Sequence, residues 1–442
     1  MNDESATSAT GSGLISRRTV LRAGVVTAAG AGIAGVAATR GGSQAIAADA
    51  TWKPTYRTEV HLAATDGWVS MPDSAKPVKG FWPDELAPAP YNMYVFGFRD
   101  VTGYNDAKVI GERGKAQISA PPLFFDEGSE IRVQLTNLGL SMRPDLVDGH
   151  TMHWHGFNNA IPIFDGVPEM SASVPIGKTI TYLFRPHDAG TYMYHCHFED
   201  VEHVQMGMTG LVCVRPLMNY ETDGKTQRYD ADGKALRYVF NDEATRYDRE
   251  YPLFLTENMP EDHWRDAHIQ ISDWAYFRAG FALFNGRAFP DTIEDTFDPA
   301  PTVSYAAGSA GERLKYQPRT ARIDAEVGEV VLLRISSLGS LRHSITMDGI
   351  PMHVVGADAS QLKGKDGHDN SYVTNSVDCG PGESRDVLFT APSTPGTYLL
   401  YDRNFMNLQN DGASGYGGML THVVVHPAGT LGQQPLELPT RM

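Results

Sequence analysis

Short runs of apolar residues, most of them β-branched or aromatic, recur along the 442-residue chain between turns rich in glycine, proline and asparagine. Strands of this length between such turns are typical of sheet proteins, and 44 glycines and 27 prolines favour the same loop-rich structure. The pattern therefore predicts an all-β protein built from sandwiches or barrels. At about 150 residues per domain, the chain is long enough for two or three of them.

Two blocks of the sequence occur twice in the same order. EGSEIRVQLTNLG (127–139) matches VGEVVLLRISSLG (327–339), and GKTITYLFRPHDAGTYMYHCH (177–197) matches GESRDVLFTAPSTPGTYLLYDR (382–403). Chance is a poor explanation for two matched blocks at similar spacing, so the repeat indicates two homologous β domains. In Greek-key sandwiches this arrangement brings loops from distant strands together at one end.

The repeat and the composition of the remaining segments set the predicted domain limits. The segment between the two copies is polar and rich in turn residues, as a linker should be. We predict an export signal over 1–50, an N-terminal extension over 51–74, domain one over 75–216, a linker over 217–234, domain two over 235–430 and a C-terminal tail over 431–442.

The N-terminus carries an export pattern. Arg17 and Arg18 precede the weakly apolar run GVVTAAGAGIAGVAA, and small residues follow around Ala47 and Ala50. This resembles a twin-arginine signal, which is an address read by a receptor and is removed afterwards. The run is too short and too rich in glycine and alanine for a convincing membrane span. We expect a secreted or periplasmic protein that is exported folded.

Charge and cysteine content narrow the class of protein further. The formal net charge of -16 argues against nucleic acid as a partner, because phosphate binding needs clustered lysine and arginine. Three cysteines do not make a disulfide framework. Cys213 and Cys379 either pair in an oxidising compartment or stay as buried apolar groups. Cys196 lies between two histidines and needs another explanation.

Histidines are concentrated in two short segments. HTMHWHG (150–156) and HCHFEDVEHVQMGM (195–208) hold much of the chain's histidine, together with Cys196. In an extended strand alternate side chains share a face, so each segment presents a pair of imidazoles on one side. Two such pairs on adjacent strands would offer four imidazoles to one metal site: His153, His155, His195 and His197.

A second donor set surrounds the cysteine. Blue copper chemistry needs a thiolate and two imidazoles in a trigonal plane, with a weak axial thioether. Domain one offers this set as His150, Cys196, His203 and Met208, and Met206 is the alternative axial ligand. Zinc is a rival for any histidine–cysteine cluster, but structural zinc sites rarely combine one cysteine, alternating histidines and a trailing methionine. We therefore predict type 1 copper next to an inner copper site.

The two motifs resemble those of the multicopper oxidases, in particular two-domain, laccase-like members built from cupredoxin folds. The resemblance covers nearly all of the chain after the signal, although His203 and Met208 lie two residues further from the cysteine than in the commonest pattern. It implies two tandem cupredoxin-like Greek-key domains and a homotrimer, in which domain two of one chain closes the site on domain one of the next. It assigns type 1 copper to His150, Cys196, His203 and Met208, and half of a trinuclear cluster to His153, His155, His195 and His197.

Domain two departs from the family pattern. HSITMDG (343–349) faces HTMHWHG, and YDR (401–403) faces HCH, so that Asp402 stands at the cysteine position. We expect domain two to lack type 1 copper and the usual cluster ligands, which leaves a mononuclear, dinuclear or trinuclear inner site open. The four histidine positions hold Thr346, Asp348, Tyr401 and Arg403. The side chains expected to compensate are Asp348, Tyr401, His343, His353 and His263.

Three functions remain open. The favoured one is an oxidase in which a phenol, an aminophenol or another small reductant gives single electrons at type 1 copper, with His150, Cys196 and His203 as the catalytic residues and dioxygen as the acceptor. The second is a nitrite-reductase-like enzyme, whose inner copper takes a histidine from domain two that YDR does not offer. The third is a non-enzymatic copper protein for electron transfer or copper handling. The four inner histidines favour the oxidase, since electron transfer alone needs only type 1 copper.

Overall fold

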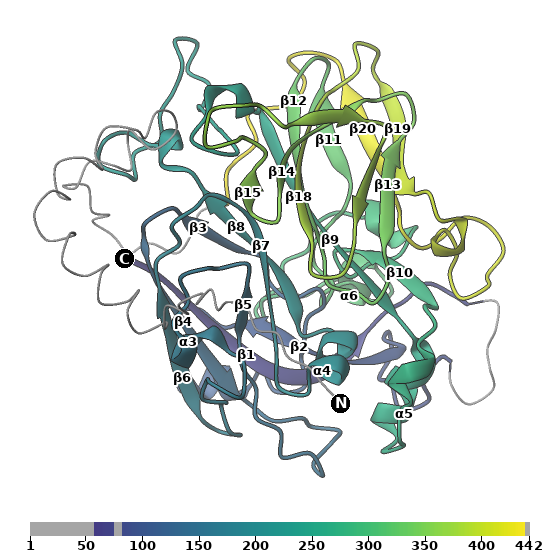
Figure 1. The fold of residues 1–442 in the computed structure, drawn as a ribbon. Coiled ribbons are helices and arrows are strands. Elements are labelled where there is room, and N and C mark those ends of the chain that lie inside the picture. The colour runs from purple at the N-terminus through teal and green to yellow at the C-terminus, as the bar shows by residue number, and fades with distance from the viewer. Residues whose placement is uncertain (1–56, 75–81, 438–442) are drawn as a thin grey trace, which may run out of the picture. The chain divides into compact units, whose positions relative to one another are not determined.

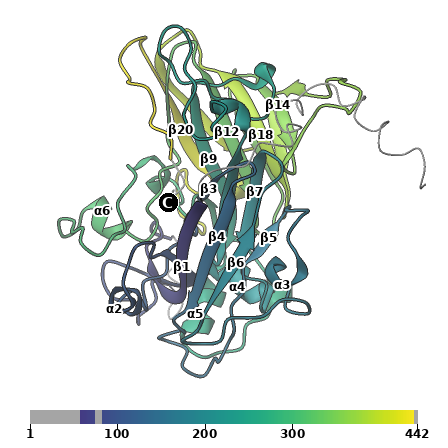
Figure 2. The ribbon, with the colours of Figure 1, turned by 90° about the vertical axis from the view of Figure 1, so that its left-hand side faces the viewer.

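The computed structural model describes residues 57–74 and 82–437, and the predicted export signal lies outside them. The first half forms two four-stranded sheets, ordered β2-β1-β4-β6 and β3-β8-β7-β5. Figure 2 shows β1, β4 and β6 running side by side. Their strands are β1 (Arg57–Val69), β2 (Met93–Asp100), β3 (Leu123–Asp126), β4 (Glu130–Asn137), β5 (His153–His155), β6 (Thr179–Phe184), β7 (Gly190–His195) and β8 (Thr209–Arg215).

The second half forms a five-stranded sheet and a seven-stranded sheet. Their orders are β11-β20-β19-β13-β17 and β10-β9-β12-β18-β14-β15, and β16 pairs with β14. Figure 1 shows β13, β19 and β20 in the five-stranded sheet. The strands are β9 (Arg249–Asn258), β10 (Phe281–Phe284), β11 (Ile323–Glu326), β12 (Val330–Ser337), β13 (His343–Met347), β14 (Met352–Ala357), β15 (Ser360–Gln361), β16 (Tyr372–Thr374), β17 (Ser376–Cys379), β18 (Ser384–Thr390), β19 (Gly396–Asp402) and β20 (Leu420–His426).

The two halves repeat one topology. The order β2-β1-β4-β6 recurs as β10-β9-β12-β18, and β3-β8-β7-β5 recurs as β11-β20-β19-β13. The parallel pairs repeat as well: β1 with β4 corresponds to β9 with β12, and β3 with β8 to β11 with β20. The predicted all-β fold with two tandem units is confirmed.

The first sandwich begins earlier than the sequence indicated. β1 lies within residues 51–74, which we assigned to an N-terminal extension, yet it pairs with both β2 and β4. Its sequence, RTEVHLAATDGWV, is rich in alanine and threonine and belongs to neither repeated block, so nothing local marked it as a central strand. The other predicted limits stay predictions.

Burial follows the strand pattern and gives each sandwich its own core. β4 buries every second residue, whereas β7 and β8 are buried at every position. One apolar cluster joins Trp154, Phe125 and Cys196 in the first half, and another joins Ile335, Val377 and Cys379 in the second. Cys213 lies in a smaller cluster with Phe254. Cys213 and Cys379 are both free thiols.

In the part of the chain that the structure describes, the helices are short and lie in the connections between strands. The longest is α5, which follows β9 in sequence but packs against β2 of the first sandwich, where His263 Nδ1 lies 2.6 Å from the carbonyl oxygen of Tyr94. Among the described residues, no helix has the length and apolar character to cross a bilayer. The helical segments are α2 (Asp106–Ile110), α3 (Pro162–Asp165), α4 (Asp200–Met206), η1 (Leu217–Asn219), η2 (Glu243–Thr245), α5 (Pro260–Ala267), η3 (Trp274–Tyr276), η4 (Asp291–Ile293), α6 (Ala310–Arg313) and η5 (Phe405–Asn407).

A buried ionic network joins the two sandwiches. Glu250 accepts hydrogen bonds from Arg215 of the first half, at 2.6 Å, and from Arg334 of the second, at 3.4 Å. Arg334 also pairs with Asp386 at 3.2 Å, and Asp386 accepts from Thr191 Oγ1 at 2.6 Å. Since all these side chains are buried, each charge depends on its partner.

We predict that Glu250→Leu lowers the free energy of unfolding by about 3–5 kcal/mol. The substitution removes the carboxylate that Arg215 and Arg334 share, and both guanidinium groups stay buried. Urea unfolding of the metal-free protein measures this change. Arg342→Leu is the matched control, because it breaks an exposed ion pair with Asp378. We expect it to lower the free energy of unfolding by less than about 1 kcal/mol. Equal effects of the two substitutions would contradict the assignment of the network.

Candidate metal centre

Three predicted ligands lie together: the imidazoles of His150 and His203 both face the buried sulfur of Cys196. Cys196 follows β7, His203 lies on α4, and His150 precedes β5, where its backbone pairs with Val174. The Sγ atom of Cys196 lies 3.2 Å from His203 Nδ1 and 3.7 Å from His150 Nδ1. All three side chains are fully buried. The two imidazoles therefore present the same ring nitrogen to one thiol.

The backbone around the thiol explains this convergence. Cys196 N donates to Met208 O at 3.1 Å, and Met208 N donates to His203 O at 2.9 Å, so the loop closes on the sulfur. Gly207 ends α4 at φ 120°, and a Cβ there would lie 2.4 Å from the Ile118 side chain. Met208 shares the fully buried cluster of Cys196 with Met206, so the choice of axial sulfur stays a prediction.

Charge at this site is arranged for a metal. Burial alone would raise the pKa of the Cys196 thiol, but the imidazoles of His203 and His150 hold it well below its usual range. Burial alone would lower the pKa of His203, but the Cys196 thiolate and Asp148 raise it. A thiolate between two Nδ1 atoms is the equatorial donor set of a type 1 copper site, so the residues fit that ion.

Four further histidines form a second cluster beside the first. β5 pairs with β7 in a register that sets His153 opposite His195. The His153 ring centroid lies 5.1 Å from that of His195, 5.2 Å from that of His197 and 5.7 Å from that of His155. The predicted inner set is thus brought together: His153, His155, His195 and His197.

Hydrogen bonds fix how these rings are turned. His153 Nδ1 lies 2.7 Å from the carbonyl oxygen of Asp165, and His195 Nδ1 lies 2.9 Å from that of Cys196. Carbonyl oxygens only accept, so each Nδ1 carries the proton and Nε2 keeps a lone pair for a metal. His155 Nδ1 is buried without a partner among the described residues.

Burial and mutual repulsion keep three of the inner imidazoles neutral. Burial lowers the pKa of His153 and of His155, and the pKa of His195 falls to about 3 because burial and the neighbouring imidazoles both oppose its charging. Neutral imidazole is the form that binds metal, so protons compete weakly here. The residues fit one or two copper ions.

A cavity of 430 Å³ opens over the four inner rings. α4 contributes to both sites: Asp200, Val201, Val204 and Gln205 line the cavity, while His203 of the same helix points to the thiol. The second half contributes Leu338, Ser340, Pro381 and Gly382, which offer no imidazole.

None of the side chains expected to compensate reaches this cavity within the chain. Thr346 faces Tyr401 across β13 and β19, as His153 faces His195 in the first half, and Tyr401 donates to Asp348 at 2.8 Å. His353 Nε2 bonds the hydroxyl of Ser371. His263 is buried on Tyr94, and His343 is buried between two carboxylates. Thr346 and Tyr401 thus take the pairing positions that His153 and His195 take in the first half, and none of the expected replacements lines the cavity.

Sequence analysis missed three residues that shape the centre. Asp148 places a buried carboxylate oxygen 3.6 Å from His203 Nε2, Asp165 orients His153, and Gln205 ties α4 to β9 by donating to the carbonyl oxygen of Glu257 at 2.9 Å. Asp148 stands two residues before the first histidine, which was the one available signal. The other two act through backbone oxygens, which leave no mark in a sequence.

Comparison with known proteins agrees with this geometry. Residues 101–218 and 266–424 each match the sequence profile of a multicopper oxidase domain. Laccase-5 of Arabidopsis thaliana is 28% identical over 264 residues, which is 59% of this chain and 37% of that protein. L-ascorbate oxidase of Nicotiana tabacum is 26% identical over 305 residues, which is 66% of this chain and 44% of the relative. The chain thus spans less than half the length of these curated relatives.

Solved structures show the same fold. A blue copper oxidase from Nitrosomonas europaea superimposes with a TM-score of 0.55 at 21% identity, covering 84% of this chain and 86% of the other. The laccase of Botrytis aclada gives 0.51 at 18% identity, covering 87% and 56%. Both likenesses support tandem cupredoxin-like domains, as predicted.

Fold and donor sets together define a cupredoxin-type copper protein. The chain belongs to the multicopper oxidase family, a family of copper-dependent oxidoreductases, which confirms the resemblance stated from its histidine and cysteine motifs. The assignment of individual ligands stays a prediction.

We predict that Gly207→Ala costs about 1–3 kcal/mol of unfolding free energy and weakens copper binding at the thiol, because the new Cβ collides with Ile118 and the backbone of Phe96 at a positive φ. Gly177→Ala is the control, since Gly177 also has a positive φ, of 72°, but no atom within 4 Å of its added Cβ. Thermal unfolding and copper titration measure both variants. A larger loss in the control would contradict the loop geometry.

Proposed function

We propose that the protein is an exported copper-dependent oxidase, which takes single electrons from a small reductant such as a phenol or an aminophenol and passes them to dioxygen. One observation carries the proposal: the buried Cys196 thiol lies between two imidazoles, and its chain neighbours His195 and His197 belong to the inner cluster. Copper held by the two clusters would accept and release single electrons. The residues proposed as catalytic are His150, Cys196 and His203.

The residues around the thiol hold it in place and exclude water. The Thr151 N–H points at Cys196 Sγ from 3.5 Å, which suits a negative sulfur. Phe96 packs edge-on against the His203 ring, and Phe198 stacks over it. His203 is fully buried, so electrons from a donor have to cross the residues that cover its ring, because solvent does not reach the imidazole.

The surface next to His203 is acidic, which supports an amine-bearing or neutral donor over an anionic one. Asp148 and exposed Glu199 bring carboxylate oxygens within 4.8 Å of a ring nitrogen of His203. A carboxylate here repels anions and can accept a hydrogen bond from a donor hydroxyl or ammonium group. Phenols and aminophenols meet both requirements.

The inner cluster supports dioxygen as the acceptor. It offers four imidazoles over an open cavity, more than simple electron transfer requires, and burial lowers the pKa of three of them: His153, His155 and His195. The donor set suits one or two copper ions, and a three-copper cluster would need ligands that this chain does not bring to the cavity. We propose a homotrimer in which another copy covers the open side, where His153 and His197 are part-exposed.

Copper-reconstituted protein tests the proposal directly. We expect about two copper ions per chain, one for each donor cluster, and the intense blue absorption of a copper–thiolate bond. Oxygen consumption with an aminophenol donor should exceed that of free copper. Fully loaded protein that is colourless would contradict the proposal, and nitrite consumption without oxygen consumption would favour a nitrite reductase.

We predict that Cys196→Ser removes the blue absorption and reduces oxygen consumption to background, because the only sulfur between the two imidazoles is lost. The inner imidazoles are untouched, so about half of the bound copper should remain. Cys213→Ser is the control, because that thiol is also buried but belongs to none of the clusters of potential metal ligands among the described residues. Blue colour that survives Cys196→Ser would contradict the ligand assignment.

A further inference from the structure

The second sandwich keeps the backbone frame of the thiol site. In the first half, the N–H of the cysteine donates to the carbonyl of the trailing methionine at 3.1 Å, and the N–H of that methionine donates to the carbonyl of the helical histidine at 2.9 Å. In the second half, Asp402 N donates to Met419 O at 3.1 Å, and Met419 N donates to Asn407 O at 2.8 Å. The residues that replace the type 1 set are therefore His343, Asp402, Asn407 and Met419.

These replacements form a closed hydrogen-bonded cluster. His343 Nδ1 lies 2.7 Å from Asp402 Oδ2, and Asn407 Nδ2 donates to the same oxygen at 2.7 Å. On the other side of the ring, His343 Nε2 bonds Glu257 Oε1 of β9. All four side chains are buried. Both ring nitrogens face carboxylates, so neither has a lone pair to offer to a metal.

The ring therefore carries a proton on each nitrogen. Burial alone would lower the pKa of His343, but the hydrogen bonds to Asp402 and Glu257 raise it to about 9. At neutral pH the imidazolium supplies a positive charge at the place where the first sandwich would hold a metal ion. Cys379 lies on β17, directly opposite His343 of β13, and stays neutral because burial raises its pKa to about 12.

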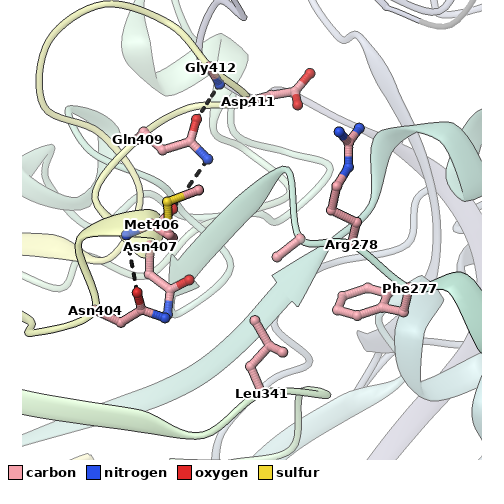
Figure 3. A pocket seen from close by; sticks show the side chains of 10 residues that line it. Phe277, Arg278, Leu341, Asn404, Met406, Asn407, Gln409, Asp411 and Gly412 are labelled. Carbon is pink, nitrogen blue, oxygen red and sulfur yellow. Dashed lines mark hydrogen bonds between the residues drawn. The ribbon is translucent and has the colours of Figure 1, made fainter.

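The cluster is screened from solvent. A cavity of 510 Å³ adjoins it, and Figure 3 shows Asn407 and Asn404 on one wall, facing Leu341, Phe277 and Arg278. Asn407 is the one cluster member on that wall, so the histidine and both carboxylates lie behind it. Low exposure strengthens the ion pairs, provided that every charge keeps its partner.

Glu257 connects this cluster to the copper-binding half. Its second carboxylate oxygen accepts from the N–H of Ser340 at 2.7 Å, which fixes the loop between β12 and β13. Its backbone carbonyl accepts from Gln205 Nε2 at 2.9 Å. Gln205 is buried on α4, two residues after His203, and the N-terminus of α4 has no side-chain cap. This bond is therefore a direct polar tie between the short helix that carries His203 and the second sandwich.

We propose that the cluster of Glu257, His343, Asp402 and Asn407 replaces a lost metal with a fixed imidazolium, and that it positions His203 for copper through the Glu257–Gln205 bond. Glu257 and Gln205 are thus positioning residues, which act on the thiol site through His203 and are not among its ligands. The inference rests on the proposed function, because it assigns His203 to the type 1 site. On this proposal the second sandwich, which lacks the copper ligands, helps to position a copper ligand of the first.

Gln205→Met tests the link, because it keeps the size of the side chain and removes the donor to Glu257. We expect the copper–thiolate absorption band to shift and copper affinity at the thiol to fall about tenfold, as for other residues that orient a ligand. Gln317→Met is the matched control: Gln317 is as deeply buried and also bonds backbone groups, but in another region. Its spectrum should equal that of the wild type.

Two outcomes separate the failures. Wild-type protein without a blue band would contradict the proposed function itself. A blue wild type together with an unchanged Gln205→Met spectrum and affinity would contradict only the positioning role. If Gln205→Met does not fold, Glu257→Gln probes the cluster itself: it keeps the backbone carbonyl that Gln205 contacts and removes one charge beside His343, and an unchanged spectrum would contradict the coupling of the cluster to His203.

Metal-free protein tests the imidazolium independently of copper. With nitrogen-15-labelled histidine, the His343 ring should remain doubly protonated at neutral pH and lose a proton only near pH 9. A neutral ring at pH 7 would overturn the proposal. Because the folded pKa lies above the unfolded value of 6.5, the cluster stabilises the fold fully below pH 6.5 and loses this contribution as pH rises through about 9.

Urea unfolding at different pH values measures this contribution. We expect the folding equilibrium constant of the wild type to fall by about 100-fold from this group between pH 6 and pH 10. Asp402→Asn removes one of the two carboxylates and should flatten that part of the profile. Identical profiles for the two proteins would contradict an ionic cluster.

Discussion

The organising contact of this molecule is a sulfur between two imidazole nitrogens, at 3.2 Å and 3.7 Å, in a pocket that no solvent reaches. A buried thiolate is unfavourable unless positive charge or a metal balances it. Other features of the first sandwich serve this requirement. The backbone bonds of Met208 close the loop, Gly207 allows the turn, and α4 delivers His203. The inner cluster follows from the same strand, because residues next to Cys196 point to its opposite face.

The second sandwich repeats the backbone hydrogen bonds of the thiol site, but it balances its buried charges in a different way. Where the first half places a thiolate between two imidazole nitrogens, the second places carboxylates around an imidazolium. A metal site that loses its cysteine leaves polar groups in a dry pocket, and these groups cost stability unless they pair with one another. The resulting cluster stays joined to α4 by Gln205, so a hydrogen bond links the two halves near the C-terminal end of the helix that carries His203.

Local motifs made much of the centre readable from the sequence. The histidines of HTMHWHG and HCH alternate along strands, and strand geometry alone sets their faces. Thr346 and Tyr401 were recognised because the repeat is aligned without gaps there. Asn407 was not, since the loop from Asp402 to Met419 is longer than the loop from Cys196 to Met208. Glu257 and β1 were missed because they act across strands far apart in the chain, and Gln205 because its partner is a backbone carbonyl.

Anomalous diffraction at the copper edge, from crystals of copper-loaded protein, tests the central claim most directly. The account predicts one peak between Cys196 Sγ and the Nδ1 atoms of His150 and His203, a second density among the four inner imidazoles, and none beside His343. A peak at His343, or none at Cys196, would contradict it.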